Sequence, residues 1–514
     1  MDDRYMFLLV IPPSLVIILK IVNNLIIRRR RSWKVPVPPG PWKLPIIGSI
    51  HHLVLGSHSQ SPHRGLRELS EKYGALMHLQ LGEVSTVVIS SREAAKEVLK
   101  THDGVFAYRP HLPPADLMIY GSTDITMSPI GHHWKLLRKI CSLQMLNGQR
   151  VRSFQSLREK EVSSLITYLS HKAISSSPLS VNLSHKLYTT IFSITTKAAF
   201  GENYKAQEEL LLASEEILKI VEDRSICEMF PSQKWLLVVT GMKGKIENIH
   251  NKIDRVLEKI IGAFGDQEEG DEPQCLLSAL LNLKQEGHIT KDHVKAVMLD
   301  MILGGTETSS ITIEWAMTQM MKNPRVLKKA QTEIREVVFN SNKGCDDNTI
   351  NETTLQELKY LKAVVKETLR LHPSAPLLIP RECTQTCEIN GYTIPIGTRV
   401  LVNAWAIGRD PNYWNLAEEF LPERFLESDI DYMGFNFKYI PFGSGKRICP
   451  GMLFGVASVE ILLANLLCFF DWKLPSGITP ETLDMAETLG TTMKRKSNLL
   501  LIPTSYNSPS SLDN

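Results

Sequence analysis

The sequence predicts a mainly α-helical chain with a small β portion, arranged as a single large domain behind an N-terminal membrane anchor. Apolar residues recur at helical spacing over much of the chain, whereas alternating, β-branched stretches are sparse. The chain has 514 residues, 43% of them hydrophobic and 22% charged. This is an ordinary globular composition, and the chain is long enough to bury a large core. The net charge of +3 is too small to argue for a nucleic-acid partner.

The N-terminus carries a membrane signal. Residues 6–27 are almost continuously apolar, and a helix needs about 20 residues to cross a bilayer. Arg28 to Arg31 follow directly. Because the strong positive charge follows the apolar segment, we favour an uncleaved anchor, with the rest of the chain in the cytosol, over a cleaved signal peptide or an interfacial helix. The chain then divides into an anchor with a basic stop (1–31), a proline-rich rigid spacer (32–49), a folded domain (50–503) and a flexible tail (504–514).

Behind the spacer, helical spacing dominates. Two stretches have strand character: 83–90, and 388–404, where turn residues separate β-branched runs. The predicted helices are 91–101, 133–145, 154–173, 207–222, 246–264, 291–322, 325–339, 355–371 and 451–469.

The eight cysteines are scattered, which indicates a reducing compartment rather than a disulfide scaffold. Cys383 and Cys387 are four residues apart, a weak metal signal because no further Cys or His cluster stands near them.

Cys449 stands in a pliable, basic loop, FGSGKRICPG. A functional thiol must be a thiolate, which needs nearby positive charge or backbone donors. Lys446 and Arg447 supply charge, glycines allow close backbone approach, and a predicted helix begins just after the cysteine. A single thiolate without a second ligand nearby suits haem better than zinc. The alternative is a buried cysteine in a turn.

The whole decapeptide fits F-x-x-G-x-R-x-C-x-G, the haem-thiolate signature of the cytochrome P-450 family, which the sequence therefore resembles. Phe442, Gly445, Arg447, Cys449 and Gly451 fill its fixed positions. The resemblance implies a cytochrome P-450-type haem domain over 50–503, with haem b bound by these residues and the Cys449 thiolate as axial ligand of the iron.

Further matches follow in the family's order. Glu367 and Arg370 form E-x-x-R, and Arg424 in PERF joins them in the family as a structural lock. Trp134 and Arg138 resemble W-x-x-x-R, whose side chains address a haem propionate. Arg381 and Arg447 are the other implied propionate ligands, because a guanidinium presents a planar fork to a carboxylate.

The stretch GGTETS, Gly304 to Ser309, resembles the family's oxygen-binding groove, although Gly304 stands where alanine is commoner. The resemblance implies that Gly305 borders the haem and that Glu307 and Thr308 relay protons to dioxygen. The alternative is a helix kink with a hydroxyl bonded back to the helix.

The resemblance runs from the spacer to the helix after Cys449 and is closest to the large plant group acting in specialised metabolism. It implies a monooxygenase that inserts one oxygen atom of O2 into a hydrophobic small molecule, with a plant terpenoid preferred. An alkaloid or phenylpropanoid hydroxylase is the alternative. A haem-thiolate isomerase or dehydratase that does not use O2 is disfavoured by Thr308, and a non-catalytic haem-binding protein is the remaining reading. The apolar segments expected to line the substrate pocket are Phe106–Ile125, Met298–Thr308, Ala375–Ile379 and Leu489–Met493.

The sequence carries no nucleotide-binding motif for a nicotinamide cofactor. NADPH is therefore expected to act only through a separate NADPH–cytochrome reductase, with cytochrome b5 as a second candidate donor. The resemblance implies a single-pass protein of the endoplasmic reticulum membrane with its catalytic domain facing the cytosol. The lysines expected to form the basic docking face for the reductase are Lys135, Lys139, Lys438 and Lys446.

Overall fold

The computed structural model describes residues 36–54, 61–174, 180–202, 204, 206–222, 226–265, 275–340, 345–346, 349–488 and 490–506. The predicted anchor lies outside these residues, as does most of the predicted tail. Within them, one helix is long and apolar enough to cross a membrane, α19 (Met452–Phe469). It is mostly buried in the protein, so it is a core helix here.

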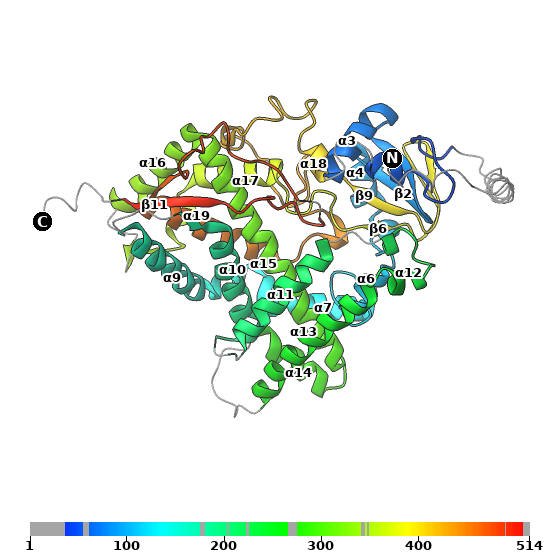
Figure 1. The fold of residues 1–514 in the computed structure, drawn as a ribbon, viewed down its shortest axis with the longest axis horizontal. Helices are drawn as coiled ribbons and strands as arrows, with labels where there is room; N and C mark the ends of the chain where they lie inside the picture. The colour runs from blue at the N-terminus through cyan, green and yellow to red at the C-terminus, as the bar shows by residue number, and fades with distance from the viewer. Residues whose placement is uncertain are drawn as a thin grey trace, which may run out of the picture.

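A large helical body and a smaller β-rich part make up the fold (Figure 1). The predicted helix 291–322 is α15 (Lys291–Lys322), which begins in a capping box between Thr290 and His293. It runs through the middle of the helical body, where it packs against α10 (Leu183–Phe200), α19 and α17 (Lys359–Leu371). The prediction of a mainly helical chain is confirmed.

Most predicted helices form within a few residues of their expected bounds. Segment 91–101 is α4 (Arg92–Lys96) continued by a π-helical turn, Glu97–Thr101. The others are α7 (His132–Cys141), α9 (Gln155–Ala173), α11 (Gln207–Glu222), α13 (Met242–Gly265), α16 (Pro324–Asn340), α17 and α19.

Among the described residues, several short helices escaped prediction, as did three helices of ten or more residues: α3 (Pro62–Tyr73), α10 and α14 (Leu276–Gln285). Helix α10 is the important omission because it lies along α15. It is buried over most of its circumference, including polar positions such as Thr195 and Thr196. Its sequence is rich in Ser, Thr and Ile, which have lower helix propensity than Ala or Leu, so the helical signal is weak.

The main sheet brings distant segments together in the order β1-β2-β9-β6. Strand β2 (Val84–Ile89) lies within the predicted stretch 83–90 and pairs antiparallel with β1 (Leu76–Leu81) and parallel with β9 (Arg399–Val402). The second predicted stretch resolves into β7 (Cys387–Ile389), β8 (Tyr392–Ile394), β9 and the short helix α18 (Ala404–Ile407). Strand β6 (Arg381–Glu382) pairs with β9, and this pairing holds Arg381 at the sheet edge nearest the helices.

A second sheet joins β10 (Phe470–Lys473), β11 (Leu500–Ser505) and β3 (Val181–Asn182), and was not predicted.

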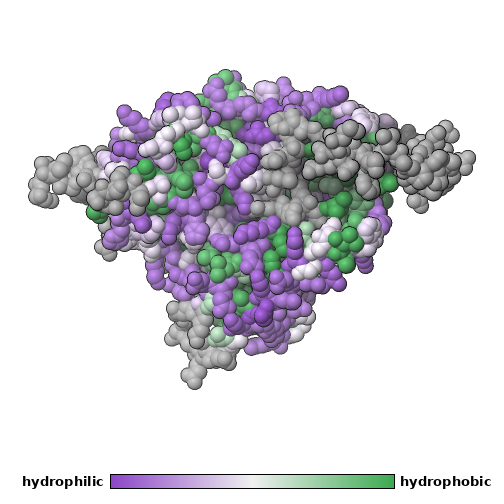
Figure 2. All heavy atoms as spheres, viewed as in Figure 1, coloured by the Kyte–Doolittle hydropathy of each residue, from purple (hydrophilic) through white to green (hydrophobic). Residues whose placement is uncertain are grey.

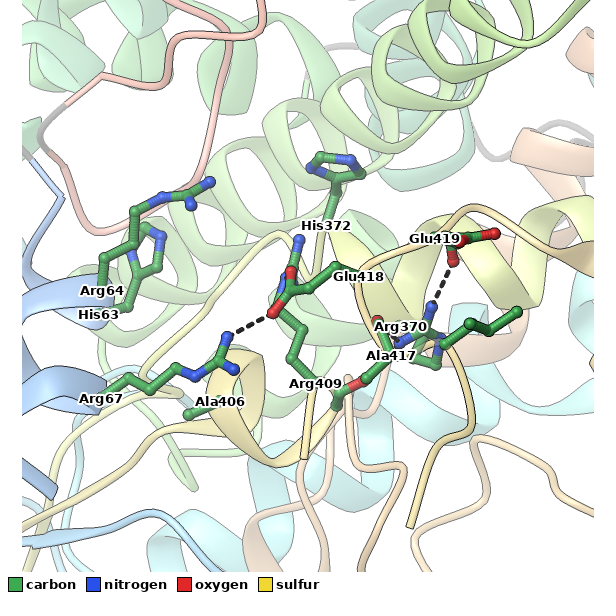
Figure 3. A network of polar contacts seen from close by, with 12 residues as sticks. His63, Arg64, Arg67, Arg370, His372, Ala406, Arg409, Ala417, Glu418 and Glu419 are labelled. Carbon is green, nitrogen blue, oxygen red and sulfur yellow. Dashed lines mark hydrogen bonds and ion pairs between the residues drawn. The ribbon is translucent and has the colours of Figure 1, made fainter. Parts of the chain in front are cut away.

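A buried ion cluster ties helix α17 to the segment that leads toward Cys449. Arg370 donates to both carboxylate oxygens of Glu367 at 2.7 and 2.8 Å, and Arg424 donates to the same carboxylate at 3.1 Å. The side chains of Glu367 and Arg370 are fully buried. Arg370 also donates to the carbonyls of Ala417 and Glu419 (Figure 3). One carboxylate shared by two guanidiniums is therefore a structural lock, as the sequence motif implied.

We expect Glu367→Gln to lower the free energy of unfolding by about 3–5 kcal/mol, because two buried guanidiniums lose their counter-charge. Urea unfolding of the holoprotein, followed by circular dichroism, measures this. Glu209→Gln, which breaks the exposed pair with Lys259, is the control and should leave the midpoint unchanged. Equal midpoints for the two variants would contradict the lock.

Candidate active site

A large cavity lies between α15, α19 and the loop that carries Cys449. Its empty volume, open mouth included, is about 1520 Å³. The lining that bears on the chemistry comprises Arg109, Arg138, Asp300, Gly304, Gly305, Thr308, Arg381, Phe442, Arg447, Cys449 and Gly451.

The Cys449 loop is shaped by two glycines in the left-handed region, Gly443 (φ 71°) and Gly445 (φ 73°). A Cβ on Gly445 would lie 2.4 Å from the Leu99 carbonyl oxygen and 2.6 Å from Asp103, so no other residue fits there. The Cys449 N–H donates to the Phe442 carbonyl at 3.0 Å, which closes the loop.

The Cys449 sulfur sits at the start of α19 and accepts hydrogen bonds from the backbone N–H groups of Gly451 and Met452. Burial raises the pKa of the Cys449 thiol, and these two donors together with Arg138 oppose the rise. The expected donors toward sulfur are therefore present. A metal ion on the sulfur would complete the stabilisation of the thiolate that the apolar cavity alone disfavours.

Four arginines reach the cavity from separate segments: Arg109, Arg138, Arg381 and Arg447. Burial lowers the pKa of Arg109 well below its usual value, and repulsion by Arg447, Arg381 and Arg138 lowers it further. Burial and the neighbouring Arg381 and Arg138 likewise lower the pKa of Arg447 to about 10. The cluster thus holds more positive charge than its protein surroundings compensate.

A haem fits this arrangement. Its two propionates would supply the missing negative charge, and the planar guanidiniums suit carboxylates. In the protein itself the arginines donate mainly to backbone carbonyls, as Arg447 does to Ala107 and Arg138 does to Ile448. Arg381 donates to Asp103 at 3.1 Å and to the Ser444 carbonyl at 2.8 Å.

Trp134 is not among the residues that line this cavity. Its indole N–H donates to the Ile125 carbonyl at 3.0 Å. The guanidiniums of Arg138 and Arg447 lie 5.3 and 4.7 Å from the centre of a Trp134 ring. Trp134 therefore orients two of the arginines, a contact different from the one with the propionate that the motif implied.

On the wall formed by α15, the neighbouring glycines Gly304 and Gly305 differ in the space that surrounds them. Nothing lies within 4 Å of a Cβ built on Gly304, so this glycine leaves open space at the cavity. A Cβ on Gly305 would lie 2.8 Å from the Thr195 methyl group of α10. Gly305 thus lets α10 and α15 approach closely, in addition to bordering the cavity.

The Thr308 hydroxyl donates to the Gly304 carbonyl at 2.7 Å. This is the hydroxyl bonded back to its own helix that the sequence offered as the alternative. The oxygen lone pairs can still accept a hydrogen bond from a donor in the cavity. Glu307 is buried and does not line the cavity; Thr492 donates to its carboxylate at 3.1 Å.

Sequence reasoning missed Arg109 and a pair of buried carboxyl groups, Asp300 and Asp124. The backbone N–H groups of Ile125 and Thr126 donate to Asp300 Oδ2 at 2.8 and 3.1 Å. Burial and the adjacent Asp124 raise the pKa of Asp300 well above its usual value, and burial raises the pKa of Asp124. Asp300 anchors the loop whose Ile125 carbonyl accepts from Trp134 and Arg447.

The signals that could have found these residues are single ionisable side chains inside apolar stretches, Arg109 in FAYRP and Asp300 in VMLDMIL. Of the four predicted pocket segments, three contribute lining residues, whereas the described residues of the fourth, 490–493, do not line this cavity. Met493 packs instead against Trp405 and Ala406.

The fold and the Cys449 loop together define a haem-thiolate protein. A model of the cytochrome P450 family matches residues 38–502. Premnaspirodiene oxygenase of Hyoscyamus muticus is 47% identical over 492 residues, 93% of this chain and 95% of that protein. Desmethyl-deoxy-podophyllotoxin synthase of Sinopodophyllum hexandrum is 50% identical over 478 residues, 91% of this chain and 92% of that protein.

A solved structure of a zebra fish cytochrome P450 with abiraterone superposes with a TM-score of 0.73 at 26% identity, covering 87% of this chain and all of that one. The chain belongs to the cytochrome P450 family. It is a monooxygenase that uses haem with a cysteine thiolate on the iron, needs an electron donor and binds a hydrophobic substrate.

We expect Asp300→Ala to lower the free energy of unfolding by about 1–3 kcal/mol, because two buried N–H groups lose their acceptor. Asp300→Asn should be nearly neutral, since an amide keeps a carbonyl acceptor and, like the protonated acid, can donate to Asp124. Urea unfolding of both holoproteins measures this.

The same variants test the pKa of Asp300. The folded wild type keeps a proton that the unfolded chain releases above about pH 4. Wild-type stability relative to Asp300→Asn should therefore fall as pH rises from 6 to 8. A difference that stays constant over this range would show that Asp300 is ionised in the fold.

Proposed function

We propose that this protein is a membrane-bound monooxygenase of plant specialised metabolism that inserts one oxygen atom of O2 into a terpenoid. Two relatives support the substrate class by their names: the premnaspirodiene oxygenase and a germacrene A hydroxylase of Barnadesia spinosa, 46% identical over 91% of this chain. The observation that carries the proposal is that the Cys449 sulfur and the Thr308 hydroxyl border one cavity with mainly apolar walls, among them Met301, Leu378 and Val459.

When bound, haem supplies an iron that activates dioxygen, and thiolate ligation favours cleavage of the O–O bond. The chain's own residues do the rest. Arg109, Arg138, Arg381 and Arg447 would hold the propionates. Cys449 presents its sulfur on one side of the cofactor, and the backbone N–H groups of Gly451 and Met452 hold that sulfur in place.

Protons reach the cavity through Thr308, whose hydroxyl sits where Gly304 leaves open space. Because this hydroxyl already donates to the Gly304 carbonyl, its oxygen can accept a bond from a proton donor in the cavity and pass a proton on. Glu307 stands one residue before it on the same helix and is joined to Thr492. We therefore add Thr492 to the proton path proposed for Glu307 and Thr308.

A second candidate is a phenylpropanoid-type substrate, which the 50% identity to the podophyllotoxin-pathway synthase favours. The same apolar walls would accept either class. A haem-thiolate isomerase that does not use O2 has no need of the Thr308 hydroxyl in the cavity, so this residue favours the monooxygenase.

We expect Thr308→Ala to consume NADPH while its yield of product per NADPH falls at least about tenfold. The reason is that a positioned proton donor typically contributes ~10²–10⁴-fold to the rate. The chain is assayed with a reductase, NADPH, ¹⁸O2 and a panel of sesquiterpene hydrocarbons and lignans. Thr308→Ser keeps the hydroxyl and should restore coupling. The terpenoid and phenylpropanoid proposals fail if no substrate acquires the label, and the relay fails if Thr308→Ala stays fully coupled.

Electrons are proposed to come from an NADPH–cytochrome reductase, with cytochrome b5 as an accessory donor. Lys135 and Lys139 lie on α7, whose Arg138 bonds to the Cys449 loop, and Lys446 lies in that loop. These three lysines are exposed and Lys438 is half-buried. An acidic partner would thus be steered to the side of the molecule that carries the sulfur.

Membrane contact is proposed to extend beyond the N-terminal anchor. Exposed apolar side chains gather on α12 (Trp235–Val239): Trp235, Val238 and Val239 are 58%, 63% and 74% exposed. Figure 2 shows hydrophobic residues, in green, on the surface in this region. The turn between β1 and β2 connects two exposed apolar segments. Its Glu83 N–H donates to the carbonyl of Met229, shortly before α12, and its Gly82 N–H donates to the carbonyl of Ile47, which is exposed together with Ile46.

We expect lipids with brominated acyl chains to quench the fluorescence of the full-length wild type more than that of Trp235→Phe, because Trp235 should lie in the bilayer. Trp472→Phe, which changes a buried tryptophan, is the control and should leave the amount of fluorescence lost to quenching unchanged. Equal quenching of wild type and Trp235→Phe would refute membrane contact at α12.

A further inference from the structure

Two cysteines that the haem site does not use lie against each other at the edge of the β-rich part. Cys387 packs against the apolar cluster that contains the buried Cys383. Cys383 Sγ also lies 3.0 Å from the Gln385 carbonyl oxygen and 3.9 Å from that of Ile394. Ile394 is the residue directly opposite Cys387 in the β7–β8 pair, so the Cys383 sulfur lies beside the residue that pairs with Cys387.

The two thiols differ in access. Cys383 is fully buried, whereas Cys387 is partly exposed. The interaction between the two thiols lowers the pKa of Cys387, while the same interaction and burial raise the pKa of Cys383. The accessible sulfur is therefore the better nucleophile, and the buried one is placed to resolve what forms on it. Metal binding is the weaker reading, because among the described residues no group of three His, Cys, Asp or Glu side chains is placed to hold an ion.

The surrounding backbone allows the pair to close. Cys383 is fixed by two bonds, from its N–H to the Thr398 carbonyl at 2.9 Å and from the Gly397 N–H to its own carbonyl at 2.7 Å. Between the cysteines, residues 384–386 form an irregular bend without helix or strand. Cys387 can thus approach Cys383 by adjusting this bend, without breaking the main sheet.

We propose that Cys383 and Cys387 form a reversible disulfide when the protein meets hydrogen peroxide. The Cys387 thiolate attacks one peroxide oxygen, the O–O bond breaks, and a sulfenic acid and one water form. Cys383 sulfur then attacks the Cys387 sulfur and expels a second water as its proton leaves. Two thiols lose two hydrogens and two electrons in all, and one peroxide becomes two waters. A dithiol reductant reverses the reaction by exchange.

The position of the pair makes this oxidant relevant. Arg381, two residues before Cys383, lines the haem cavity. A monooxygenase delivers two electrons and two protons to dioxygen. When the reduced oxygen is released without oxidising substrate, it leaves as hydrogen peroxide. The dithiol is therefore close to a place where its oxidant arises.

Peptide mapping of the full-length holoprotein tests the proposal. After exposure to submillimolar hydrogen peroxide and removal of the excess with catalase, the chain is unfolded in N-ethylmaleimide and digested with trypsin. Both cysteines fall in one peptide, Glu382–Arg399, because cleavage follows Arg381 and Arg399. We expect this peptide to be two hydrogens lighter and free of maleimide, and to carry two maleimides when the oxidised protein is first treated with a dithiol.

Substitutions separate the two roles. Cys383→Ser should let Cys387 proceed to sulfinic acid, because no thiol remains to resolve the sulfenic acid. Cys227→Ser, which changes a buried cysteine elsewhere, should leave the disulfide intact. The proposal is overturned if the peroxide-treated wild-type peptide keeps two maleimides, or if Cys387 is overoxidised while Cys383 remains labelled.

Discussion

Backbone N–H groups at the start of α19 aim at the Cys449 sulfur, and much of the structure follows from the need to keep that sulfur anionic inside an apolar cavity. An isolated thiolate would not persist there, because burial favours the neutral thiol. The loop therefore needs glycines at 443 and 445 to reach its shape. At 445 a glycine is also required because Leu99 and Asp103 approach too closely for a side chain. Iron on the sulfur supplies the remaining positive charge.

A second charge problem lies at the edge of the same cavity, where four arginines converge. Asp300 of α15 fixes the backbone at Ile125, and the Ile125 carbonyl accepts from Trp134 and Arg447. The wall proposed to face the substrate is thereby connected to the residues proposed to face the propionates. A change at Asp300 should therefore be felt on both sides of the cofactor, although Asp300 has no place in the family motifs quoted from the sequence.

The sequence was informative where one local pattern determines the outcome. Helix α15 formed over its predicted residues, since its apolar spacing and its cap at Thr290 agree. The Cys449 loop was recognisable because its glycines and cysteine have a fixed spacing. Helix α10 was missed because its many Ser and Thr residues weaken the helical signal. Arg109 and Asp300 were missed because their importance depends on partners far along the chain: Asp300 and Ile125 are 175 positions apart, and Arg109 and Arg447 are 338 positions apart. Trp134 was found, but its contact with the Ile125 carbonyl could not be read from its spacing to Arg138.

The most direct test of the account is the absorption spectrum of the reduced protein in carbon monoxide, for wild type and for Cys449→Ala. The wild type should give the Soret band typical of thiolate-ligated haem. Cys449→Ala, which keeps all four arginines, should lose that band together with oxygenation. A wild type without the band, or a Cys449→Ala protein that retains it, would contradict ligation of the iron by Cys449.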